Sequence, residues 1–116
     1  MRRLSLVGCS LAFAACGSNL TSTNDFSSPV TACRSFATSI CTRESTCKSG
    51  IDVNSCAQLL ANSENCNEAG CASGSTYSPT NAQQCSNDYL NQSCPDSANG
   101  VIPLSCAQSK ICVPAP

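Results

Sequence analysis

The stretch SPVTACRSFATSICTRESTC, residues 28–47, decides the fold of this chain. Ser28 is a good N-terminal helix cap, and Pro29 is favoured in the first turn of a helix. Apolar residues and cysteines then recur at the spacing of one helical face, which predicts a helix over residues 29–46. The residues at this spacing are Val30, Cys33, Ala37, Ile40, Cys41 and Cys47.

The same signals predict two further helices. Gly50 interrupts the first apolar pattern, and Asp52 can cap a second helix, whose apolar residues share one face. Ser78-Pro79 repeats the start signal of the first helix. The chain between the second and third helices is small and polar, and the chain after Cys94 is rich in turn residues. We therefore predict an all-α, small disulfide-rich domain with three short helices, over 29–46, 53–63 and 79–92, joined by stapled loops.

Cysteine makes up 12 of the 116 residues, a level typical of secreted disulfide scaffolds. The chain has neither histidine nor a C-x-x-C pair, so common zinc, iron–sulfur and thioredoxin-type sites are excluded. We expect structural disulfides, with no metal, no cofactor and no catalytic residue. The cysteines assigned to these disulfides are Cys33, Cys41, Cys47, Cys56, Cys66, Cys71, Cys85, Cys94, Cys106 and Cys112.

The short turn between the first two helices makes them antiparallel neighbours. It places Cys47 and Cys56 at the same end of this helical hairpin, so we expect a bridge between them. Cys66 and Cys71 are expected to pin the loop over residues 65–78. The remaining pairings stay open, because ten cysteines allow roughly 900 connectivities.

The first 15 residues have the layout of a secretion signal, with a basic start, an apolar centre and a small-residue end. The apolar part is too short for a transmembrane helix, which needs roughly 20 residues. Cleavage after Ala14 leaves eleven cysteines, an odd number. Lipidation at Cys9 leaves too short an apolar segment. Cleavage before Cys16 leaves ten cysteines to pair and commits the Cys16 sulfur to a lipid thioether.

Phe13-Ala14-Ala15-Cys16 resembles the lipobox of bacterial lipoprotein signals, with Phe13 in place of the usual Leu or Val. The resemblance implies a diacylglyceryl group on Cys16 and an acylated new N-terminus, which together anchor a protein stably to a membrane. Gly17 after the lipidated residue favours the outer membrane, by analogy with other bacteria. We expect a lipoprotein signal peptide over 1–15, a flexible Ser/Thr/Asn-rich tether over 16–28 and a cysteine-rich helical domain over 29–116.

The cysteine spacing over about residues 28–112 also resembles that of the small cysteine-rich lipoproteins of myxobacteria and related bacteria. This sequence departs from the family pattern by lacking an Arg soon after Cys56 and by having a shortened tail after Cys112. The resemblance implies a helical, disulfide-stapled exported domain and brings no activity with it. The matching segments are Cys33-x3-Ala37-x3-Cys41-x5-Cys47, Ser78-Pro79-x5-Cys85-x8-Cys94 and Pro103-x2-Cys106.

Residues with catalytic potential form no motif. Glu64 and Glu68 flank Cys66, but two carboxylates this close without a cation suit a solvated loop better than an acid/base pair. Without histidine, a serine nucleophile would need Lys48 or Lys110 as its base.

Two other features bear on partners. Tyr77 and Tyr89 are expected to be partly buried rather than to form a binding face. Beyond the signal, four scattered basic residues stand against seven acidic ones, so a nucleic-acid interface is excluded.

We therefore expect a non-enzymatic, disulfide-stapled exported protein, anchored by lipid to a bacterial membrane. It would serve as a surface or periplasmic structural or binding module with a protein or glycan partner. A freely secreted cysteine-rich inhibitor or effector is the main alternative, and it requires an unmodified Cys16. A small hydrolase is the second alternative function, and it requires at least two of four charged residues to lie in one pocket. These residues are Glu64, Glu68, Asp88 and Lys110.

Overall fold

The structure, a computed structural model, describes residues 25–115. The expected signal peptide, with Cys9, and residues 16–24 of the expected tether, with the Cys16 lipidation site, lie outside the described residues. The helices are α1 (Pro29–Cys47), α2 (Val53–Ser63), α3 (Pro79–Leu90), α4 (Cys94–Ala98) and α5 (Gln108–Ile111), the 3-10 helices are η2 (Cys66–Glu68) and η3 (Leu104–Cys106), and the strands are β3 (Ser75–Tyr77) and β4 (Cys112–Pro114).

The predicted helical class is confirmed, and the helix starts follow from local chemistry. Ser28 and Thr31 form a reciprocal capping box at the start of α1. The Asp52 carboxylate accepts hydrogen bonds from two backbone N–H groups at the start of α2. Ser78 accepts one from Asn81 at the start of α3. Gly50, in the turn between α1 and α2, has a φ of 87°, which favours glycine.

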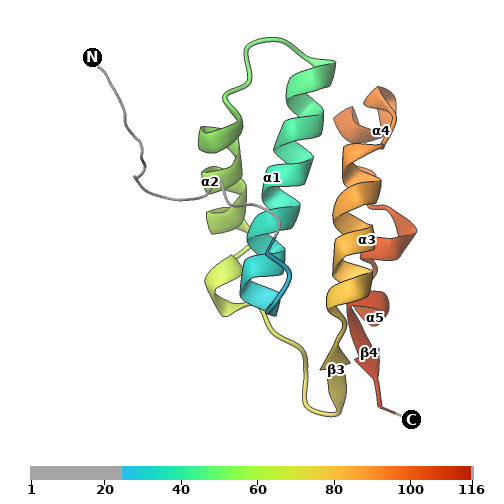
Figure 1. Ribbon diagram of the computed structural model, residues 1–116. Helices are drawn as coiled ribbons and strands as arrows, with labels where there is room; N and C mark the ends of the chain where they lie inside the picture. The colour runs from blue at the N-terminus through green and yellow to red at the C-terminus, as the bar shows by residue number, and fades with distance from the viewer. Residues whose placement is uncertain (1–24, 116) are drawn as a thin grey trace.

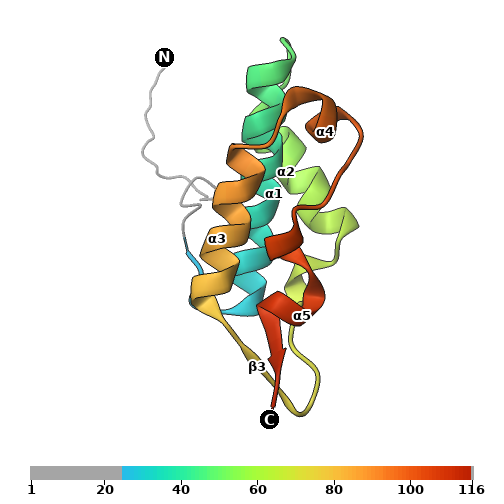
Figure 2. The same ribbon diagram turned by 90° about the vertical axis from the view of Figure 1, so that its right-hand side faces the viewer.

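Helix α1 is the centre of the domain, with α2 on one side and α3 on the other (Figure 1). The turn between α1 and α2 lies at the same end of the molecule as α4. At the opposite end, β3 and β4 form a two-stranded antiparallel ribbon that projects beyond the helices (Figure 2). None of the helices within the described part of the chain has the length and apolar character needed to cross a bilayer.

The interior is built from small side chains. Ala37, Cys41 and Ala57 form the buried centre between α1 and α2. Between α1 and α3, the buried hydroxyls of Ser39 and Ser86 are hydrogen-bonded to each other. Among the described residues the fully buried apolar side chains are alanines and cysteines, so the helices pack closely but bury little apolar area.

Five disulfides compensate for this thin core, and the structural use of all ten cysteines is confirmed. Three of them join α1 to other elements. A fourth joins the loop before β3 to strand β4, and the fifth joins α3 to η3. Each restricts the unfolded chain, which stabilises the folded state. The pairs are Cys33–Cys66, Cys41–Cys56, Cys47–Cys94, Cys71–Cys112 and Cys85–Cys106.

The expected bridge between Cys47 and Cys56 is wrong. Cys56 is joined to Cys41, and Cys47 is joined to Cys94 at the start of α4. Cys41 and Cys47 are six residues apart, which turns their side chains by roughly 120° around the helix. Cys41 therefore faces α2 and meets Cys56 one turn inside that helix, whereas Cys47 faces α4.

Residues 25 and 26, at the end of the expected tether, make contacts with the helical domain. The ring of Phe26 lies 6.5 Å from that of Phe36, centroid to centroid. The backbone carbonyl of Phe26 accepts a hydrogen bond of 2.7 Å from the Tyr77 hydroxyl. The Asp25 carbonyl accepts another, of 3.1 Å, from the Ser35 hydroxyl. The Ser/Thr-rich composition hides these contacts, because they are made to residues distant in sequence.

The structure adds elements that local patterns did not predict. Helix α4 forms where only turns were expected, with Ser93 as its cap and Pro95 in its first turn. Strand β3 lies within the segment expected to be a loop, and strand β4 lies at the tail of the chain. The two strands pair with Tyr77 opposite Cys112. The Cys71–Cys112 bridge joins β4 to the loop before β3, so a short, weak pair of strands is held together covalently.

Candidate functional site

One concave surface is a groove of about 480 Å³ along α1, which we call the apolar groove. Its floor is the face of α1 that carries Phe36 and Ile40, and Leu60 of α2 forms one wall. Tyr89 of α3 and the segment over residues 97–102 form the opposite side. Ligand-binding sites in proteins have volumes and apolar linings of this kind.

The segment over 97–102 leaves apolar side chains open to solvent. Val101 is 44 % exposed and Ile102 is 64 % exposed, although both line the apolar groove. The segment is held in place by Gln92, whose side-chain amide donates a hydrogen bond of 2.6 Å to the Val101 carbonyl. Arg43 in turn donates a hydrogen bond of 2.6 Å to the Gln92 carbonyl. The exposed apolar rim is therefore fixed by polar contacts.

Two carboxylates give the apolar groove its charge. Glu64, the residue that ends α2, and Glu44 on α1 both line it. Burial raises the pKa of the Tyr89 hydroxyl above its usual value, and the negative charge of Glu64 raises it further. The field of the Glu64 carboxylate therefore reaches the phenol on the opposite side of the groove.

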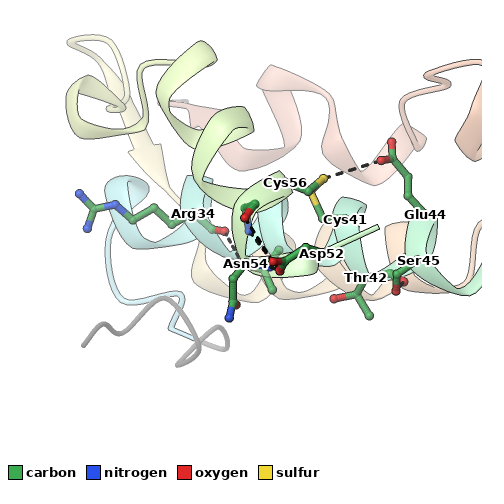
Figure 3. The surroundings of a disulfide bond; sticks show 10 residues. Arg34, Cys41, Thr42, Glu44, Ser45, Asp52, Asn54 and Cys56 are labelled. Atoms are coloured by element: carbon green, nitrogen blue, oxygen red, sulfur yellow. Dashed lines mark hydrogen bonds between the residues drawn. A yellow bond between two sulfur atoms is a disulfide. The ribbon is translucent and has the colours of Figure 1, made fainter. Parts of the chain in front are cut away.

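Glu44 also lies beside a disulfide. Figure 3 shows its side chain directed at the Cys41–Cys56 bridge, and its Oε1 is 3.8 Å from the Cys56 sulfur. The two sulfurs and this carboxylate have the proximity of a metal site. The sulfurs are bonded to each other, however, and a disulfide offers no thiolate to a metal ion. In the oxidised protein this cluster is therefore a bridge with an anionic neighbour.

A second hollow, of about 560 Å³, is polar. Its lining includes the side chains of Gln58, Asn62, Asn67 and Glu68, and the Arg34 guanidinium donates a hydrogen bond to the Asn67 amide oxygen. Most of this lining is exposed to solvent. The surface therefore provides hydrogen-bonding groups without enclosing a ligand.

The charged residues considered for a hydrolase lie apart. Glu64 lines the apolar groove and Glu68 lines the polar hollow. The Asp88 carboxylate accepts hydrogen bonds from Ser105 at 2.5 Å and from Gln84 at 2.8 Å. Lys110 is exposed on α5. The four side chains do not converge on a common point.

No family model, curated protein or solved structure matches this chain. Function therefore has to be argued from the geometry of the apolar groove, the charges around it and the disulfides that hold it.

Sequence reasoning did not find the apolar groove. Tyr89 was expected to be a partly buried residue rather than a contact residue, and it is both half-buried and part of the groove lining. Glu44 and Ile102 carried no local signal of a site. One available signal was Val101-Ile102, an apolar pair directly after the Asn99-Gly100 turn, where a solvated loop would be polar.

Proposed function

We propose that this protein is an exported, lipid-anchored, non-enzymatic binding module that holds a protein partner at a bacterial membrane, in the outer membrane by analogy. The chain is bonded to diacylglycerol through Cys16 after removal of residues 1–15. The apolar groove is the surface that faces the partner. The observation that carries this proposal is a groove with an exposed apolar rim on a domain stapled by five disulfides.

The disulfides support export, because bridges of this density form and persist in oxidising compartments outside the cytosol. They also support a role in binding. A surface whose walls are tied to one another loses little conformational entropy when a partner is bound, which favours affinity. α1 and α2 are joined by Cys41–Cys56, and α1 is joined by Cys47–Cys94 to α4, next to the groove rim.

Contacts of residues 25 and 26 fix where the anchored segment joins the domain. The Asp25 carbonyl accepts a hydrogen bond from Ser35 of α1, and the Phe26 carbonyl accepts one from Tyr77 of β3. Nine peptide links separate Cys16 from Asp25, which allow a reach of at most about 30 Å. An anchored domain of this kind stays close to the membrane while its helices remain accessible.

Mass spectrometry of the native protein, before and after reduction, tests this proposal. We expect a chain that begins at an acylated Cys16 and gains ten hydrogen atoms on reduction, two for each bridge. Fractionation of the source cells should place the intact species in the outer membrane. A protein recovered from the medium with an unmodified Cys16 would contradict the anchor and favour the secreted inhibitor or effector.

A further inference from the structure

The apolar groove combines two features that select a ligand. Phe36, Ile40 and Leu60 are only partly buried within the domain, so they retain apolar area for a partner. The exposed side chains of Val101 and Ile102 extend this area along the rim. Such a surface favours aliphatic or aromatic side chains, since covering it removes apolar area from water.

The second feature is the sign of the charge. Of the described residues that line the groove, Glu44 and Glu64 are acidic and none is Lys or Arg. Arg43, the residue before Glu44, donates to the Gln92 carbonyl. Lys48, one turn further along α1, lines the neighbouring hollow between the end of α1 and α4, which Glu44 also lines. The groove thus offers two carboxylates to a ligand beside an apolar surface.

We infer that the apolar groove binds a segment of a basic protein in which apolar side chains are interspersed with Lys or Arg. The apolar side chains cover Leu60 and Ile102, and the cations meet Glu44 and Glu64. Lys and Arg suit both parts of this surface, because their aliphatic stems pack on apolar groups while their charged ends reach the carboxylates. This inference rests on the proposed binding role and specifies the chemistry of the partner.

The shape of the surface favours a polypeptide over a small cation. The lining comes from α1, α2, α3 and the segment over residues 97–102, so the groove is open along its length and can accept successive side chains. Binding through two partly solvated charge pairs and a small apolar area is expected to be modest in affinity and sensitive to salt.

Binding of short peptides to the full acylated, oxidised protein in detergent tests the inference. The probe is a fluorescent peptide of alternating leucine and lysine, compared with peptides in which glutamate or serine replaces lysine. We expect the lysine peptide to bind, the glutamate peptide not to bind and the serine peptide to bind on the order of tenfold more weakly. Salt at about 0.5 M should remove most of the difference between the lysine and serine peptides.

Matched double variants locate the interaction. Glu44→Gln with Glu64→Gln should weaken the lysine peptide on the order of tenfold. Glu68→Gln with Asp96→Asn makes the same change in net charge on residues outside the lining and should leave binding within about twofold. Intact mass and circular dichroism should show that both variants keep five bridges and their helices. Amide resonances of Leu60, Tyr89 and Ile102 should shift on titration of the wild type.

Several results would overturn the inference. Equal losses in the two double variants would indicate general charge attraction rather than a site. Equal affinity for the serine and lysine peptides would refute the role of the carboxylates. It would not contradict the proposed binding role of the groove. Binding of phosphocholine vesicles with the same dependence on Glu44 and Glu64 would identify a lipid headgroup instead. An unacylated native chain would instead refute the proposed anchor, independently of the peptide results.

Discussion

At the scale of single residues, Tyr77 connects two segments that are far apart in the sequence. Its hydroxyl donates to the Phe26 carbonyl, and its backbone lies in the ribbon opposite Cys112. The phenol therefore fixes the point at which the N-terminal segment joins the domain. It does so in a protein where small side chains provide most of the core.

Replacing Tyr77 with phenylalanine tests this connection. We expect the free energy of unfolding to fall by about 1 kcal/mol, because the partly buried Phe26 carbonyl loses its donor. Hydrogen exchange should accelerate at residues 26–28 and stay unchanged in α2. Tyr89→Phe removes the same atom at a distant position and serves as the control. Unchanged exchange at residues 26–28 in Tyr77→Phe would show that the contact does not hold the segment.

The two tyrosines also predict an alkaline limit of stability. Burial raises the pKa of Tyr77 above its usual 10.0, with a further contribution from the charge of Asp25. Burial and then Glu64 raise the pKa of Tyr89 in the same way. The folded state thus favours the neutral phenols. The resulting stabilisation is complete below the unfolded pKa and is lost as the pH rises through the folded values.

Ultraviolet titration of tyrosinate measures this effect directly. The folded protein should ionise above pH 10, and the reduced and alkylated chain near its ordinary value of 10.0. Because the sequence has two tyrosines, Tyr77→Phe isolates the titration of Tyr89. A folded titration that coincides with that of the unfolded chain would refute the assigned burial.

At the scale of elements, α1 and α3 meet through a polar contact inside a small-residue interface. Ser39 and Ser86 are 6 % and 3 % exposed, and their hydroxyls pair with each other. The pair specifies the register of the two helices, because a hydroxyl left without its partner in this interface is costly.

A double-mutant cycle on this pair is expected to be strongly non-additive. Ser39→Ala or Ser86→Ala alone should lower the free energy of unfolding by about 1–3 kcal/mol, because each leaves one buried hydroxyl unpaired. The combined variant should be close to the wild type, since neither unpaired hydroxyl remains. Chemical denaturation measures all four proteins. Additive losses would show that the hydrogen bond does not determine the interface.

The elements differ in how far the sequence predicts them. The starts of α1, α2 and α3 were predictable because Ser28, Asp52 and Ser78 cap their own helices through contacts two or three residues away. Helix α4 was also within reach, since Ser93-Cys94-Pro95 is a variant of the same start signal. The ribbon of β3 and β4 was not, because its strands are short and come from distant segments.

The pairing of the cysteines and the apolar groove were not predictable for a related reason. A hairpin argument brought Cys47 near Cys56 but did not include the rotation of side chains around α1, which directs Cys47 to α4. The groove lining extends from Cys33 to Ile102, so no local pattern contains it. Both features depend on how helices are placed around α1 rather than on where they start and end.

At the scale of the whole molecule, the Cys47–Cys94 bridge ties one end of α1 to α4, next to the rim of the apolar groove. Replacing both cysteines with alanine should lower the free energy of unfolding by about 2–4 kcal/mol. It should also accelerate hydrogen exchange over residues 94–102. Cys71→Ala with Cys112→Ala is the matched control, because that bridge lies at the opposite end of the molecule and closes a loop of similar length. Its cysteines are 41 residues apart in the sequence, and those of Cys47–Cys94 are 47 apart. Equal exchange over 94–102 in both variants would contradict the role assigned to Cys47–Cys94.

The order of the five bridges along the chain has a consequence for biogenesis. No bridge joins two cysteines that are consecutive among the ten, and three of them need a partner from residue 94 onward. A polypeptide oxidised as it emerges N-terminus first would link neighbouring thiols before their native partners arrive. We therefore expect maturation to require reshuffling by a disulfide isomerase as well as an oxidase. Cells that lack the isomerase should accumulate scrambled isomers of identical mass.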